Sequence, residues 1–118
     1  MRVLILEDDP FIALDLQSIL ESEGHEVVGV FSSLAEAHDH LEDSFDYALL
    51  DIDVVDGKTF GLAAELLARR IPFAFVSASR PAEVPAPLRG ASFIPKPFEE
   101  GTILESIAQA EPGRPVFH

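Results

Sequence analysis

The 118-residue sequence contains no cysteine, and this absence excludes two kinds of site. Without thiols the chain has neither a disulfide framework nor a thiolate metal centre, which suits a reducing compartment, so we expect a cytoplasmic protein. Long hydrophobic runs are absent as well, and no segment approaches the ~18 apolar residues of a membrane-spanning helix. The apolar run at residues 2–6 is too short for the core of a signal peptide.

Basic residues are scarce. Eight lysines and arginines stand against 21 acidic residues, which gives a formal net charge of −13. Binding to nucleic acid requires a basic face that neutralises phosphates, and an anionic membrane surface repels a chain of this charge. We therefore expect neither nucleic acid nor a membrane among the partners of this protein.

The sequence does contain 47% hydrophobic residues, in a length that suits one folded domain. Short apolar runs alternate with amphipathic stretches of helical spacing. We predict five strands, at residues 3–6, 26–31, 48–50, 73–76 and 91–94. Helices are predicted between them and after the last one, at residues 10–23, 34–41, 60–70 and 99–110.

The alternation of strands and helices predicts an α/β fold with a doubly wound, five-stranded parallel sheet, because parallel neighbours need a crossover connection. The connection over residues 80–90 holds Pro81, Pro85 and Pro87, which predicts a short or remodelled fourth helix. We assign residues 1–111 to this domain and residues 112–118 to a short C-terminal tail.

Polar residues follow four of the predicted strands. They are the acidic pair Asp8 and Asp9, then Asp51, Ser77 and Lys96. Ligands of open parallel sheets bind outside the carboxyl ends of the strands, so these side chains are expected to share one rim. Asp51 ends a strongly apolar strand, and a buried carboxylate needs a cation or an ionic partner.

This combination of residue types suits phosphoryl transfer. Carboxylates on neighbouring strand ends are ligands that Mg²⁺ prefers. A lysine supplies a point charge for the oxygens of a phosphoryl group, whose transfer depends on positioning and on charge stabilisation.

In this order and at these strand ends, the residues resemble the receiver domain of response regulators in bacterial two-component signalling, over residues 2–110. The resemblance implies the flavodoxin-like strand order 2-1-3-4-5. It also implies that Asp51 is the phosphoacceptor, while Ser77 and Lys96 contact phosphoryl oxygens. The shortened fourth helix is similar to a stand-alone subgroup of receivers, although residues 76–79 do not spell the usual motif of that subgroup.

The resemblance further implies a Mg²⁺ cofactor, held by Asp8, Asp9 or both together with Asp51 and the backbone carbonyl of Asp53. Ser77 and Phe93 would form the switch that couples the site to the surface.

The implied partner is a histidine kinase or a histidine phosphotransfer protein. We expect no enzyme activity beyond self-catalysed phosphotransfer and autodephosphorylation, and a monomer or weak homodimer. Output would pass through protein contacts or phosphate flow without an effector domain, and the Met1 start favours a separate small regulator or an N-terminal receiver. Val55 stands where family members often have proline, so the loop after the third strand is expected to differ.

Other functions stay open. A haloacid dehalogenase-like phosphatase would use Asp51 as nucleophile and Asp53 as general acid, but it needs an acidic pair after a later strand. A receiver-like protein that binds partners without phosphorylation is a second alternative.

Several residues also have purely structural interpretations. Asp9 has the position of a helix N-cap, Phe93 of a core residue, and Asp56 with Gly57 of a turn with a helix cap. His38 and His40 do not face each other on a helix, so we assign them no metal.

Overall fold

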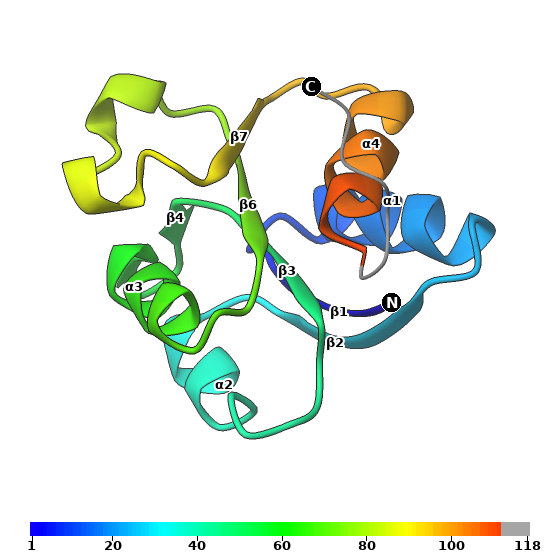
Figure 1. The fold of residues 1–118 in the computed structure, drawn as a ribbon, viewed down its shortest axis with the longest axis horizontal. Coiled ribbons are helices and arrows are strands. Elements are labelled where there is room, and N and C mark those ends of the chain that lie inside the picture. Colours follow the sequence, from blue (N-terminus) through cyan, green and yellow to red (C-terminus); the bar gives the residue numbers. More distant parts are fainter. Residues whose placement is uncertain (112–118) are drawn as a thin grey trace.

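The structure is a computed structural model that describes residues 1–111 (Figure 1). Its centre is a five-stranded parallel sheet with the order β2-β1-β3-β6-β7. The strands are β1 (Arg2–Leu6), β2 (Glu26–Phe31), β3 (Tyr47–Leu50), β6 (Phe73–Ser77) and β7 (Ser92–Pro95). The predicted α/β class and strand order are confirmed, because β6 and β7 are the fourth and fifth strands of the prediction. The predicted tail at residues 112–118 lies outside the described part of the chain.

Helices cover both faces of the sheet. Within residues 1–111 the α-helices are α1 (Pro10–Ser22), α2 (Leu34–His38), α3 (Phe60–Ala68) and α4 (Glu100–Ala110). Figure 1 shows α1 and α4 on one side of the sheet and α2 and α3 on the other. This arrangement explains the continuous apolar runs of the central strands, since both of their faces are buried.

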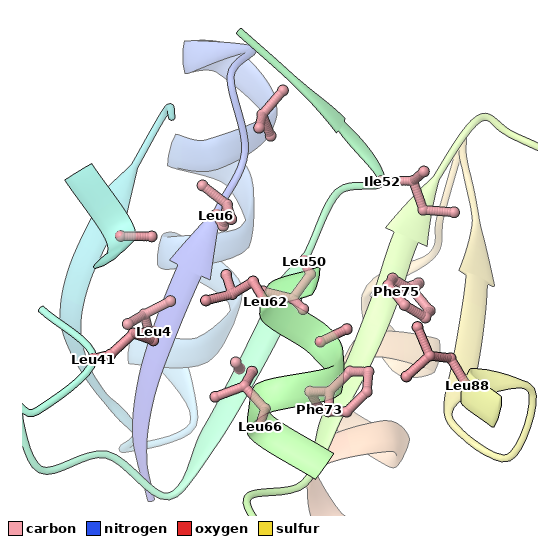
Figure 2. Packing of buried hydrophobic residues seen from close by; sticks show 14 of the residues in the cluster. Leu4, Leu6, Leu41, Leu50, Ile52, Leu62, Leu66, Phe73, Phe75 and Leu88 are labelled. Carbon is pink, nitrogen blue, oxygen red and sulfur yellow. The ribbon is translucent and has the colours of Figure 1, made fainter. Parts of the chain in front are cut away.

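Successive side chains of each strand point to opposite faces of the sheet, so the strands contribute to two separate hydrophobic cores. The core beneath α2 and α3 is shown in Figure 2, where Leu4, Leu50 and Phe75 point from the sheet toward Leu62 and Leu66 of α3. The opposite core joins the other strand faces to α1 and α4. Each fully buried leucine or phenylalanine contributes roughly 1.5–3 kcal/mol, so these two layers hold the strand ends in place.

The segment between β6 and β7 is remodelled, as predicted. Two short 3₁₀ turns, Pro81–Glu83 and Ala86–Leu88, connect β6 to β7 where a regular α-helix would otherwise lie. The prolines explain the change, because they remove the backbone donors that an α-helix requires. Buried Val84 and Leu88 fasten the segment to the core beneath α3.

Two helices end in the same left-handed motif. Behind α1, Gly24 has φ 84°, and His25 N donates to Leu20 O. Behind α3, Arg70 has φ 59°, and Ile71 N donates to Leu66 O. This motif favours glycine, so Arg70 occupies a strained backbone position.

The helix α2 is shorter than predicted, since it ends at His38 instead of residue 41. The chain continues in tighter turns, in which His40 N donates to Ala37 O and Leu41 N donates to His38 O. Leu41 stays buried, so the apolar spacing of the sequence is satisfied without a regular helix.

The sequence did not predict a small antiparallel hairpin, which follows β3. It consists of β4 (Asp53–Val54) and β5 (Gly57–Lys58), and Gly57 has φ 141° at its turn. At the edge of the large sheet, β7 ends in Pro95, which lies opposite Ser77 of β6. Among the described residues, no helix combines the length and apolar character that crossing a membrane requires.

Candidate functional site

The carboxyl ends of four neighbouring strands place the candidate residues on one rim. Asp51 follows β3, and its N–H donates to Leu6 O at the end of β1 with a distance of 2.8 Å. Lys96 follows β7, and its N–H donates to Ser77 O at the end of β6 with a distance of 3.0 Å. The parallel register therefore aligns Asp51, Ser77 and Lys96 as the sequence predicted from the strand ends.

Lys96 reaches back across the rim to the acidic side chains. Its Nζ lies 3.0 Å from Oδ2 of Asp51 and 2.5 Å from Oε1 of Glu7. Burial alone would lower the pKa of Lys96, but the hydrogen bonds and charges of Glu7 and Asp51 outweigh it and raise that pKa. The lysine is thus a permanent positive charge beside Asp51.

Three carboxylates gather at the same place. Oxygens of Glu7, Asp8 and Asp51 lie within 4.8 Å of one another, and this is the one such group of potential metal ligands among residues 1–111. Glu7 and Asp51 are buried, with exposed fractions of 3% and 8%, whereas Asp8 is exposed. Hard carboxylate oxygens at this spacing fit a cation such as Mg²⁺, and the open side at Asp8 leaves room for the waters that Mg²⁺ retains.

Glu7 is the acid that the sequence interpretation missed. Burial is the main reason why its pKa rises from 4.5 to about 7, and the nearby charge of Asp51 adds to the rise against the hydrogen bonds from Lys96 and Asp9 N. Its Oε1 pairs with the Lys96 ammonium, and its Oε2 accepts the hydrogen bond from Asp9 N. The sequence did contain a signal for this residue. The apolar run ends at Leu6, so Glu7 is the first residue beyond the strand and lies at its carboxyl end.

Asp9, predicted as a metal ligand, has a different place. Its Oδ1 accepts hydrogen bonds from Phe11 N at 2.9 Å and Ile12 N at 3.3 Å, so it is the N-cap of α1. The acidic pair that the structure brings to Asp51 is Glu7 with Asp8. We correct the predicted pair accordingly: β1 ends at Leu6 as expected, but its first two following residues form the pair, and Asp9 already caps α1.

The hairpin of β4 and β5 begins two residues after Asp51, and the residue that follows the hairpin is hydrogen-bonded to Asp51. Asp51 Oδ1 accepts a hydrogen bond from Ile52 N at 2.7 Å, and Asp51 O accepts one from the hydroxyl of Thr59 at 2.6 Å. Thr59 is fully buried and was not singled out from the sequence. Its position just before a helix suggests an ordinary cap, so no local pattern marked this contact.

The side chain of Asp53 points along the hairpin toward other partners. Lys58 Nζ lies 2.5 Å from Oδ1 of Asp53, and Ser79 Oγ donates to Oδ2 at 3.1 Å. The hydrogen bond from Lys58 is the first cause of the lowered pKa of Asp53. A general acid needs a raised pKa, so this environment counts against the phosphatase alternative.

Asp56 lies at the tip of the hairpin and caps a helix, but not the one that follows it. Its carboxylate accepts from Leu34 N at 2.7 Å and from Ala35 N at 3.1 Å, at the start of α2. The hydrogen bond from Leu34 is the first cause of its lowered pKa. The hairpin thus connects the acceptor strand with α2.

The two predicted switch residues lie on adjacent strands. Ser77 is buried, and its Oγ accepts a hydrogen bond from Ser79 N at 3.1 Å. Phe93 is half-buried and lines a cavity of about 410 Å³ between the sheet and the remodelled segment. Among the histidines, His40 stacks on Phe31 at 4.7 Å and contacts Asp43.

Comparison with known proteins agrees with this geometry. The family model of the response regulator receiver domain matches residues 3–108. Phyllosphere-induced regulator PhyR of Methylorubrum extorquens is 36% identical over 118 residues, which cover 92% of this chain and 43% of that protein. Transcriptional regulatory protein PdtaR of Mycobacterium tuberculosis is 29% identical over 114 residues, with 92% and 56% covered. The chain therefore spans about half the length of these curated relatives.

Solved structures show the same likeness. The signal receiver domain of a modulated diguanylate cyclase from Desulfovibrio desulfuricans has a TM-score of 0.83 at 33% identity, with 92% of this chain and 91% of that chain covered. SdrG from Sphingomonas melonis has a TM-score of 0.81 at 31% identity, with 93% and 95% covered.

Proposed function

The chain belongs to the response regulator receiver domain family, whose members are regulatory and not classical enzymes, and we propose that it accepts a phosphoryl group on Asp51. The donor is a histidine kinase or a histidine phosphotransfer protein. The observation that carries the proposal is the position of Asp51, whose carboxylate lies beside the Lys96 ammonium and close to the acids Glu7 and Asp8.

The residues of the chain have separate roles in the transfer. The bond between phosphorus and an imidazole nitrogen of the donor breaks as a carboxylate oxygen of Asp51 forms its bond to phosphorus. Lys96 attracts the phosphoryl oxygens, because its charge is permanent and already lies at the acceptor. Ser77, buried at the neighbouring strand end, donates its hydroxyl to another phosphoryl oxygen.

Glu7, Asp8 and Asp51 would hold Mg²⁺ together with the backbone carbonyl of Asp53, and Asp9 keeps its role as helix cap. When bound, Mg²⁺ would neutralise charge on the transferring phosphoryl group.

We expect the domain to signal through protein contacts or onward phosphate flow. Ser77 and Phe93 connect the acceptor with the segment between β6 and β7, which borders a cavity. PhyR and PdtaR are named as regulators, and this likeness supports a signalling role. We further propose that the protein acts in the cytoplasm as a monomer or weak homodimer.

The deciding experiment is phosphorylation of the purified protein by candidate histidine kinases with labelled ATP. Asp51→Asn should abolish the acid-labile and base-labile label while the fold persists, since the substitution is nearly isosteric. Asp53→Asn is the matched control and should still accept label, because the Asp53 carboxylate faces Lys58 and Ser79. Labelling of the Asp51 variant at the wild-type rate would refute the proposal.

A further inference from the structure

Thr59, the residue before α3, has a side-chain contact that is unusual for its position. It precedes α3 as the N-cap residue, yet its side chain makes no hydrogen bond to the first turn of that helix. The hydroxyl donates instead to the backbone carbonyl of Asp51 at 2.6 Å, and the residue is fully buried. A threonine at this position normally stabilises its own helix, so the contact with Asp51 replaces a favourable local one.

The backbone of Thr59 makes a second contact with the same place. Thr59 N donates to Ile52 O at 2.9 Å, next to the hydroxyl bond to Asp51. Above this pair, Asp53 lies opposite Lys58 and Val54 opposite Gly57 in the hairpin. Residues 51–59 therefore form a closed loop, and Thr59 joins its two ends.

This closure holds the acceptor from both sides. Asp51 N donates to Leu6 O at 2.8 Å, and Asp51 O accepts from Thr59, so both of its backbone polar groups are bonded. The direction of the Asp51 side chain follows from that backbone. The same closure sets the path of Asp53, whose carbonyl is the fourth proposed ligand of the cation.

We propose that Thr59 is a positioning residue for the acceptor and for the cation site. Its hydroxyl orients the Asp51 carboxylate and the Asp53 carbonyl together, through the backbone of residues 51–59. The inference rests on the proposed function for the identity of the reaction, and on the Thr59 contacts alone for the closure of the loop. Residues that orient metal ligands typically change metal affinity by about 10- to 100-fold when they are removed.

The test uses three variants of the full chain. Thr59→Val keeps the shape of the side chain and removes the hydroxyl, whereas Thr59→Ser keeps the hydroxyl. Ser106→Ala is the control for loss of a partly buried hydroxyl contact elsewhere, because Ser106 bonds Tyr47 at the start of β3. Mg²⁺ titration by calorimetry and amide hydrogen exchange in metal-free protein are measured at a temperature where all variants are folded.

We expect Thr59→Val to weaken Mg²⁺ binding at least about tenfold and to speed exchange of the Thr59 amide by a similar factor. Thr59→Ser should stay within about threefold of wild type in both measurements, and Ser106→Ala should leave both unchanged. Wild-type affinity in Thr59→Val, or an equal loss in Ser106→Ala, would overturn the inference. If wild type itself binds no Mg²⁺, the proposed cation site fails, and exchange that is no faster in Thr59→Val would still overturn the closure.

Discussion

The ammonium nitrogen of Lys96 lies 2.5 Å from Oε1 of Glu7, whose side chain is almost completely buried. The same nitrogen also faces Asp51, so one positive charge serves two buried carboxylates while Asp8 adds a third acid nearby. Buried charge without compensation costs several kcal/mol. Proton uptake and cation binding therefore compete for the same carboxylates at this rim.

The raised pKa of Glu7 predicts an unusual pH dependence of stability in metal-free protein. Between its usual value of 4.5 and the folded value of about 7, the unfolded chain ionises Glu7 while the folded chain retains the proton. Stability from this group is present below pH 4.5 and is lost as the pH rises to 7, by up to about 3 kcal/mol. Urea unfolding between pH 4.5 and 8 with a chelator measures this loss.

The matched variant for that measurement is Glu7→Gln, which keeps the shape of the side chain and cannot ionise. Its difference in unfolding free energy from wild type should shift in favour of the variant as the pH rises through this interval. A difference that stays constant with pH would contradict the raised pKa. Saturating Mg²⁺ should reduce the pH dependence of the wild type, because a cation stabilises the ionised form.

Asp8 and Asp9 are expected to respond differently to mutation. Mg²⁺ should raise the melting temperature of the wild type, and Asp8→Ala should remove most of this response, because Asp8 belongs to the acid cluster. Asp9→Ala should keep the response but lose about 1 kcal/mol of stability, the usual cost of an N-cap. The reverse pattern in thermal melts would indicate that Asp9, and not Asp8, binds the metal.

Arg70 is expected to be a site where glycine stabilises the protein. Its φ of 59° is strained for a residue with a Cβ atom, at roughly 1–2 kcal/mol, while glycine gives back roughly 0.5–1 kcal/mol through the entropy of the unfolded chain. Arg70→Gly should therefore gain about 0.5–1 kcal/mol in urea unfolding. Arg69→Gly, one residue earlier in the right-handed region, is the control and should be destabilising.

The response to phosphorylation is expected in the segment between β6 and β7. Beryllofluoride with Mg²⁺ imitates the phosphoryl group, and backbone NMR shifts should then change over residues 77–98. Since residues 81–88 form 3₁₀ turns beside a cavity, we expect a loop rearrangement that includes Phe93, without rotation of a helix. Shift changes restricted to the neighbours of Asp8 and Asp51 would contradict this prediction, and Asp51→Asn provides the unresponsive control.

The sequence predicted the rim well where the strand ends decide it. Asp51, Ser77 and Lys96 each follow an apolar run, and parallel pairing aligns such ends at one edge of the sheet. The proline content also predicted the remodelled segment, because proline acts on the backbone locally.

The remaining features depend on detail that no local pattern supplies. Three consecutive acids follow β1, and a shift of one residue decides which of them reach the rim and which caps the helix. Thr59 meets Asp51 only because a hairpin folds the chain back over eight residues, and a threonine before a helix otherwise indicates a cap. The partner of Asp56 lies earlier in the chain at α2, so its contact depends on tertiary structure.

Pro95 at the end of β7 has a consequence for self-association. Lys96 N points inward to Ser77 O, so the alternation of the strand turns the nitrogen of Pro95 outward, where it has no hydrogen to donate. A strand from another molecule that paired with this edge would lose a ladder bond at the position nearest to the acceptor. Proline at this position therefore disfavours strand addition at the edge beside the acidic rim.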